Sequence, residues 1–178
     1  MMTRTSMNGK ICIYGGTFDM PHLGHLASYE WLRAQGHAVI VVPAIGHEFK
    51  PHTVSTYLYR IAMCRRTFGD VNVRGVEEAV LSIKPVPIMA IDVMREVHDV
   101  FGSRPVFAIG PDVDIERWTG IDLIRSEGYE FVRMPEVEST PRSSVIRELI
   151  AMGKPWDQHV TEGVAKFIRL HGLYGCKS

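Results

Sequence analysis

The sequence predicts an α/β fold, a doubly wound parallel sheet in a single domain over residues 1–178. Short apolar runs alternate with amphipathic stretches, an order typical of repeated strand and helix units. Residues 39–42, Val-Ile-Val-Val, are apolar without alternation, as expected for a parallel strand that helices cover on both faces. A glycine also follows each of four helical stretches, where a residue with positive φ often ends a helix. These glycines are Gly36, Gly69, Gly102 and Gly128.

Five strands are expected where apolar runs lie between turn residues, at 10–14, 38–43, 71–74, 105–110 and 129–134. Helices are expected between them, where apolar side chains recur at helical spacing, at 25–35, 55–68, 88–101 and 121–127. Each strand–helix–strand unit is expected to form a right-handed crossover. Ligands of such a sheet bind at the carboxyl ends of its strands, near the point where the strand order reverses.

A C-terminal helical part follows the fifth strand. After a loop at 135–141, a short helix is expected from residue 143 to about Gly153, because serines at a helix start can cap it. A last helix is expected at 161–170, with its apolar residues near one face. We expect this part, about residues 143–174, to pack on the same core.

Composition limits the classes of partner. Lys plus Arg and Asp plus Glu both number 20, so the net charge of zero gives no reason to expect nucleic acid or a membrane as partner. Three cysteines without short spacing fit a reduced compartment better than a disulfide framework. No apolar stretch approaches the ~18 residues of a spanning helix. We therefore expect a cytoplasmic protein. Its oligomeric state stays open, a homo-oligomer included.

The most informative segment is residues 15–25, Gly-Gly-Thr-Phe-Asp-Met-Pro-His-Leu-Gly-His, between the first strand and the first helix. A helix start offers unpaired N–H groups and the positive end of the dipole, and glycine lets phosphate oxygens approach the main chain. His22 and His25 are three residues apart, so on one helix face both can donate to the same anion. The segment predicts a nucleoside triphosphate site.

Residues 142–147, Arg-Ser-Ser-Val-Ile-Arg, form a second candidate anion site, because two hydroxyls at a helix start precede an arginine one turn later. Asp112, after the fourth strand, is an acid that can accept from ribose hydroxyls. The loop at 47–52 carries Lys50 and two histidines.

Each segment also has a plain structural interpretation. His22 and His25 could be ordinary helix-start residues or half of a metal site, although no other histidine has ligand-like spacing to them. Residues 143–147 could be a capped surface helix, and the loop at 47–52 a solvated turn. Trp118 could simply pack in the core.

Residues 15–25 resemble the first signature of the nucleotidyltransferase superfamily, whose H-x-G-H motif binds triphosphate, and in particular that of nicotinate and nicotinamide mononucleotide adenylyltransferases. Residues 142–147 resemble the family's closing I-S-S-T-x-I-R signature. Residues 172–174 resemble the Gly-Leu-Tyr with which the family's C-terminal stretch ends. Two positions depart from the family, because Met20 replaces a proline and Arg142 replaces the first serine. The resemblance runs from about residue 11 to residue 174.

The resemblance implies a Rossmann-like nucleotidyltransferase fold and assigns roles by position. His22, His25 and Lys50 are implied to be catalytic, and Lys50 and Trp118 to bind the mononucleotide, Trp118 by stacking on the pyridine ring. The residues implied to bind ATP are Gly15, Gly16, Thr17, Phe18, His22, His25, Gly110, Asp112, Ser143, Ser144 and Arg147.

The implied activity is adenylyl transfer from ATP to nicotinate or nicotinamide mononucleotide, which gives deamido-NAD or NAD and pyrophosphate in NAD biosynthesis. No catalytic base is needed, because a phosphate monoester with its second pKa near ~6 is already largely ionised at neutral pH. A Mg²⁺ ion carried by the ATP phosphates would need few protein ligands, so no metal site of the protein's own is expected.

Two other interpretations stay open. A sibling enzyme with a phosphopantetheine, FMN or glycerol-phosphate acceptor would have a similar first turn, and a nucleotide-sensing module could keep the fold without turnover. Between the two pyridine mononucleotides we expect nicotinate. Arg117, beside Trp118, favours the acid if its side chain points inward.

Overall fold

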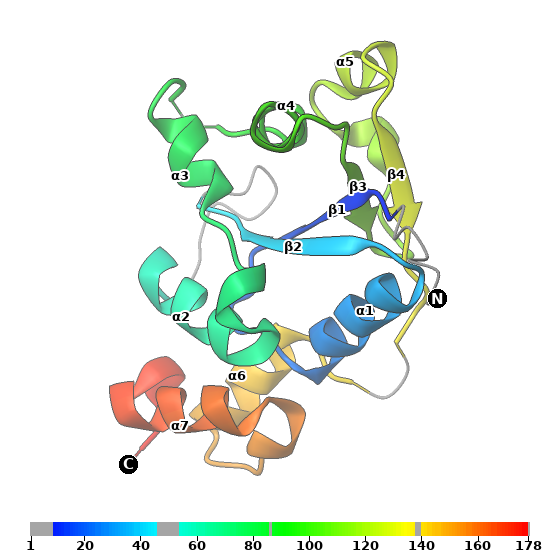
Figure 1. Cartoon of the computed structure of the whole chain (residues 1–178). Coiled ribbons are helices and arrows are strands. Elements are labelled where there is room, and N and C mark those ends of the chain that lie inside the picture. Colours follow the sequence, from blue (N-terminus) through cyan, green and yellow to red (C-terminus); the bar gives the residue numbers. More distant parts are fainter. Residues whose placement is uncertain (1–8, 46–53, 86, 138–139, 178) are drawn as a thin grey trace, which may run out of the picture.

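Four parallel strands form one sheet in the order β2-β1-β3-β4. They are β1 (Ile11–Gly16), β2 (Ala38–Pro43), β3 (Val106–Ile109) and β4 (Glu130–Arg133) (Figure 1). The structure is a computed structural model that describes residues 9–45, 54–85, 87–137 and 140–177. The strand order reverses between β1 and β3, so a doubly wound parallel sheet is confirmed.

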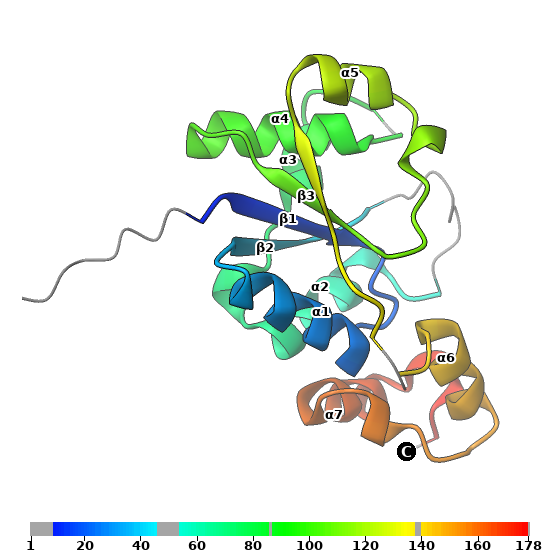
Figure 2. The ribbon, with the colours of Figure 1, turned by 90° about the vertical axis from the view of Figure 1, so that its right-hand side faces the viewer.

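Helices cover both faces of this sheet (Figures 1 and 2). One face carries α1 (Leu23–Ala34) and α2 (Tyr57–Phe68), and the other carries α3 (Val76–Leu81), α4 (Ala90–Phe101) and α5 (Ile121–Ser126). Two C-terminal helices, α6 (Ser143–Ala151) and α7 (Glu162–His171), lie beyond α1 and α2, away from the sheet.

The strand residues divide between the two faces as a pleated strand requires. Val39 and Val41 belong to the apolar cluster under α1 and α2, whereas Ile40 and Val42 belong to the cluster under α3, α4 and α5. All four are buried. The run without alternation therefore has the cause expected from the sequence, a strand covered on both sides.

The expected strand at 71–74 is wrong. Asp70–Asn72 forms a 3-10 helix, and only Val73 bridges to β2, opposite Val41. The Asn72 amide donates to the Phe68 carbonyl 2.7 Å away, and Val71 is 74% exposed. A side-chain bond back to the preceding helix competes with the ladder, so a single residue marks the place of a fifth strand.

Other boundaries move by one or two residues, and one helix was not expected. Helix α1 begins at Leu23 instead of residue 25, and α4 at Ala90 instead of residue 88. Helix α3 lies in a segment that the sequence left unassigned. The four glycines at helix ends all have positive φ, between 69° and 86°, as predicted.

The C-terminal helices have an apolar cluster of their own. Ile146, Ile150 and Val164 pack there with Met63 of α2 and Met20 of the turn after β1. Met20 is fully buried in this cluster. The C-terminal part therefore packs against α2 and the first turn rather than against the sheet itself.

Arg60 joins the carboxyl ends of β1 and β2. It is only 1% exposed, and its guanidinium donates to the carbonyl of Thr17 at 2.7 Å and to that of Ala44 at 2.6 Å. The Thr17 carbonyl follows β1 and the Ala44 carbonyl follows β2, so one buried guanidinium supplies a hydrogen-bond donor to both. The loops that leave this edge of the sheet consequently have fixed starting points.

Replacing Arg60 with Met should lower the free energy of unfolding by roughly 2–4 kcal/mol, because two buried carbonyls lose their donor. Chemical denaturation measures the change. Arg65→Met on the same helix is the matched control, since the Arg65 side chain pairs with the exposed Asp70 at 3.5 Å and, among the residues described, with no buried group. Equal losses in the two variants would contradict the role of Arg60.

Candidate active site at the carboxyl ends of the strands

The two imidazoles of the first turn lie face to face at the start of α1. Their ring centroids are 3.8 Å apart. His22 is the N-cap residue, and its Nδ1 accepts from the N–H of Gly24 at 3.1 Å. The Nδ1 of His25 accepts in turn from the N–H of His22 at 3.2 Å. Because both Nδ1 atoms are acceptors, a neutral ring carries its proton on Nε2.

Burial lowers the pKa of the His22 imidazole to about 4, and the charge of His159 nearby adds to the effect. His22 is 9% exposed. At neutral pH it is therefore an uncharged donor rather than a cation. A hydrogen bond from such a donor is directional, so His22 suits an oxygen held at one position.

Gly24 stands where the start of α1 meets the loop before α6. A Cβ at this position would lie 2.4 Å from the Thr140 hydroxyl oxygen and 3.0 Å from the His22 ring. The glycine of the H-x-G-H pattern is thus required by close packing. Its absent side chain lets the His22 ring and Thr140 approach the helix.

The start of α6 meets the first turn directly. The hydroxyl of Ser143 donates to the Met20 carbonyl at 2.8 Å, and the Arg147 guanidinium donates to the Asp19 carbonyl. The sequence expected the segments around residues 22 and 143 to converge, and they do. Ser143 and Arg147 hold the main chain of the turn in this structure, while Ser144 is exposed at the same helix start.

Asp19 is a site residue that the sequence analysis did not single out, although it lies within the 15–25 motif. Its carboxylate accepts from the N–H of Val54, from the N–H and hydroxyl of Ser55, and from the Tyr174 hydroxyl at 2.6 Å. Burial alone would raise the pKa of Asp19, but the bonds from Ser55, Tyr174 and Val54 outweigh it and hold the pKa below its usual value. The C-terminal Tyr174 thereby joins the first turn.

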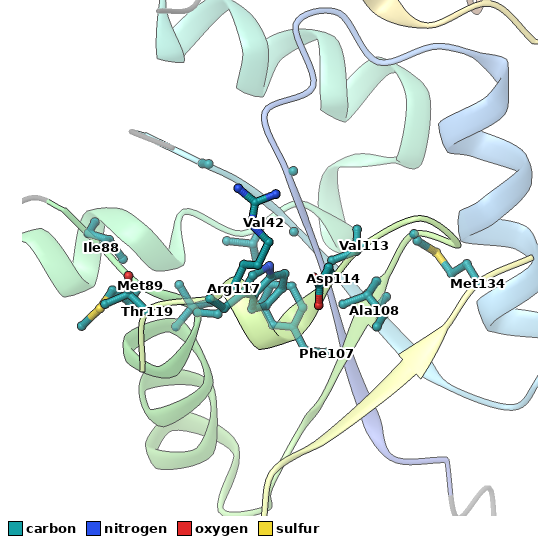
Figure 3. Close-up of a pocket in the computed structure, with 18 of the residues that line it drawn as sticks. Val42, Ile88, Met89, Phe107, Ala108, Val113, Asp114, Arg117, Thr119 and Met134 are labelled. Carbon is teal, nitrogen blue, oxygen red and sulfur yellow. The ribbon is translucent and has the colours of Figure 1, made fainter. Parts of the chain in front are cut away.

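A cavity of about 650 Å³ opens beside the same strand ends (Figure 3). Gly15 and Gly16 of β1 line it together with Phe107 and Trp118, and a Cβ on Gly15 would lie 2.8 Å from the Phe107 ring. The Trp118 ring packs edge to face against Phe107 and Phe131, with centroids 5.6 and 5.7 Å away. Trp118 thus packs against the core and also borders the cavity, and its stacking on a pyridine ring stays a prediction.

The loop after β3 carries Gly110 and Asp112 at the cavity. The Arg133 guanidinium at the end of β4 donates to the carbonyls of Gly110, Pro111 and Val113, at 2.9–3.0 Å. Asp112 is exposed and lies 3.7 Å from Arg142, at the start of α6. The expected ribose-binding acid is therefore held on a braced loop, facing the second anion segment.

Glu77 is another residue that the sequence missed, because α3 was not expected. It is 7% exposed, lines the cavity, and accepts from the N–H of Ile45 at 2.6 Å. A carboxylate of α3 thus holds the beginning of the loop after β2. No local pattern in residues 76–81 would have pointed to this contact, since the partner lies 32 residues away.

The remaining expected residues divide into three groups. Lys50 lies outside the described residues. Phe18 is 3% exposed, with its ring against Tyr14, His25 and Phe68, so only its main chain can face a ligand. The Thr17 hydroxyl is buried and has no hydrogen-bond partner among the residues described.

Two wider features bear on possible ligands. Within the described ranges, no group of three or more His, Cys, Asp or Glu side chains could hold a metal ion. In the same part of the chain, no helix is both long and apolar enough to cross a bilayer.

Known proteins resemble the chain over nearly its whole length. A family model described as cytidylyltransferase-like matches residues 13–149. Proteins of Chlorobaculum parvum and Shouchella clausii, each described as "Probable nicotinate-nucleotide adenylyltransferase", are 27% and 29% identical. The matches cover 91% and 93% of this chain and 97% of each relative.

Solved structures share the fold. A Vibrio parahaemolyticus structure superposes with a TM-score of 0.72 at 22% identity, over 90% of this chain and 99% of that one. The Plasmodium falciparum nicotinic acid mononucleotide adenylyltransferase, complexed with NaAD, superposes with a TM-score of 0.70 at 14% identity. That match covers 95% of this chain and 98% of the other.

Replacing Gly24 with Ala should distort the junction between α1 and α6, because the new methyl group collides with Thr140 and with the His22 ring. We expect a loss of about 1–3 kcal/mol in the free energy of unfolding, measured by denaturant titration. The double variant Gly24→Ala, Thr140→Ala should recover part of it. No recovery would show that Thr140 is not the obstacle.

Replacing Asp19 with Asn tests the buried carboxylate through pH. Because the folded pKa of Asp19 is below its unfolded value near 3.8, its charge stabilises the protein above that value, and this contribution is lost as pH falls through the folded pKa. The variant should be less stable than the wild type at pH 7, by about 1–3 kcal/mol, and the gap should narrow below pH 4. Asp99→Asn, at an exposed acid of α4, is the control. A gap that stays constant to pH 3 would contradict the assignment.

Proposed function

The chain belongs to the cytidylyltransferase-like family, and we propose that it transfers the adenylyl group of ATP to nicotinate mononucleotide, forming deamido-NAD and pyrophosphate. One observation carries the proposal. Two helix starts far apart in sequence, at His22 and at Ser143, meet at the strand ends beside a cavity with aromatic walls. The descriptions of the relatives support the same acceptor.

The triphosphate would lie at the start of α1. Its oxygens would meet the Nε2–H groups of the two histidines and the main-chain N–H groups near Thr17. Arg147 would add positive charge from α6, in addition to holding the Asp19 carbonyl. Asp112 would accept from the ribose hydroxyls, on the loop that Arg133 braces.

The reaction needs alignment more than proton transfer. The acceptor phosphate, with its second pKa near ~6, is largely ionised at neutral pH and attacks the α-phosphorus without a base. The donors stabilise the charge that develops on the phosphate oxygens as pyrophosphate leaves. A neutral His22 with a fixed Nε2–H fits this role, because the ring is oriented before the substrate binds.

Mg²⁺ would enter as part of the substrate. The described residues offer it no cluster of ligands, and a Mg²⁺ ion commonly keeps several waters and binds through substrate phosphates. When bound, it would neutralise charge on the phosphates. The protein's own part would be to hold the oxygens that the ion leaves free.

The acceptor would occupy the cavity between the glycines of β1 and Trp118. Its phosphate would lie near Gly16, next to the triphosphate, and its flat ring would lie against Trp118. Lys50, which the family resemblance implies for the acceptor phosphate, stays a prediction.

The direct test is product formation by the purified protein with ATP, Mg²⁺ and a panel of acceptors. We expect pyrophosphate release and a dinucleotide with nicotinate mononucleotide. Preferential turnover of a phosphopantetheine, FMN or glycerol-phosphate acceptor would identify a sibling enzyme instead. ATP binding without turnover of any acceptor would identify a nucleotide-sensing module.

The variant His25→Ala tests whether this turnover depends on the imidazoles that follow β1. A donor that acts mainly in the transition state is commonly worth ~2.7–4 kcal/mol, so kcat should fall roughly 100- to 1000-fold. His37→Ala is the matched control. His37 directly precedes β2, so it lies at the amino ends of the strands, whereas the site lies at their carboxyl ends. Unchanged turnover in a folded His25→Ala protein would remove this assignment.

A further inference from the structure

The cavity beside β1 is lined by four charged side chains among the residues described, namely Glu77, Asp112, Asp114 and Arg117. Three are acidic and one is basic. A substrate with a phosphate and a second negative group would therefore meet mainly negative charge, unless that charge is already engaged.

Each of the three carboxylates has a partner. Glu77 accepts from the N–H of Ile45 at 2.6 Å, and Asp114 accepts from the N–H of Glu116 at 3.1 Å. Asp112 lies 3.7 Å from the guanidinium of Arg142. Glu77 and Asp114 thus hold backbone N–H groups of the cavity wall, and Asp112 faces the guanidinium of Arg142.

Arg117 differs from them. Within the part of the chain that the structure describes, its guanidinium makes no hydrogen bond or ion pair. Its main chain is fixed, because it ends the 3-10 helix Ile115–Arg117 that Asp114 caps. The pair of Glu116 with Arg125 ties the same helix to α5. The stem is therefore anchored while the charged group is left for a ligand, and Figure 3 shows Arg117 among the side chains that surround the cavity.

The position of Arg117 within the cavity indicates which part of the acceptor it meets. It directly precedes Trp118, and both residues line the cavity. A flat ring seated against Trp118 would therefore carry its substituent beside Arg117.

We infer that Arg117 selects an acceptor whose ring carries a carboxylate, so that it determines specificity for nicotinate over nicotinamide mononucleotide. This inference rests on the proposed function. A guanidinium matches a carboxylate through two parallel N–H donors and opposite charge. The amide of nicotinamide offers one neutral acceptor oxygen, and its NH₂ group would face a cation.

The test compares kcat/KM for the two mononucleotides in the wild type and in Arg117→Met. Hydrogen bonds to charged groups are worth about 1.5–3 kcal/mol, which corresponds to roughly 10- to 100-fold. The ratio of kcat/KM for nicotinate to nicotinamide mononucleotide should fall by at least about tenfold. The fall should come mainly from a higher KM for nicotinate mononucleotide, while the KM for ATP stays the same.

Two further variants sharpen the result. Arg117→Lys keeps the charge without the planar pair of donors, so it should restore part of the preference. Arg104→Met is the matched control, because Arg104 is an exposed arginine just before β3, at the opposite end of that strand from the cavity. It should leave the ratio unchanged. Thermal unfolding of each variant checks that the fold is intact.

The outcomes separate this inference from the proposed function. An active wild type whose preference is the same in Arg117→Met overturns the inference alone. Equal losses for both mononucleotides also overturn it, since they would assign Arg117 to the shared phosphate. A wild type that adenylylates neither mononucleotide overturns the proposed function, and the inference falls with it.

Discussion

The structure of the site depends on how the turn after β1 is held. Its backbone carbonyls and its one carboxylate are bound from three directions. Arg60 of α2 holds the Thr17 carbonyl, Ser143 and Arg147 of α6 hold the carbonyls of Met20 and Asp19, and Tyr174 reaches the Asp19 carboxylate. Segments more than a hundred residues apart in the chain thus converge on the four consecutive residues 17–20. Turns leave many backbone groups unpaired, and here side chains from other segments satisfy them.

This bracing prepares the site for catalysis before any substrate arrives. Each imidazole accepts a backbone N–H at Nδ1, and the two ring centroids lie 3.8 Å apart, so both rings keep a set orientation. Donors that need no reorganisation stabilise developing charge most effectively. Residues that the motif suggests as phosphate ligands therefore also hold the site in place. Ser143 and Arg147 donate to carbonyls of the turn, and the Phe18 ring packs against His25.

Local sequence pattern predicts some elements of the structure correctly and misses others. Runs such as residues 39–42 identify buried strands, because burial on both faces requires apolar residues at every position. The segment at 71–74 was misassigned, since Asn72 bonds back to α2 and leaves Val71 in solvent. Helix α3 was missed, and with it Glu77, whose role depends on Ile45 rather than on its own neighbours.

The amino-acid sequence by itself determined the layered α/β architecture, most of the strand and helix order, and the two helix starts rich in hydrogen-bond donors, at residues 22–25 and 143–147. These follow from short-range rules, namely apolar periodicity, glycine at helix ends and the hydrogen-bonding needs of a helix start. Only the tertiary structure decided which atoms are occupied and which stay available for a ligand. The Nδ1 atoms of the histidines, the carboxylate of Glu77 and the guanidinium of Arg117 illustrate this, because a polar group's partner is set by distances that chain separation does not encode.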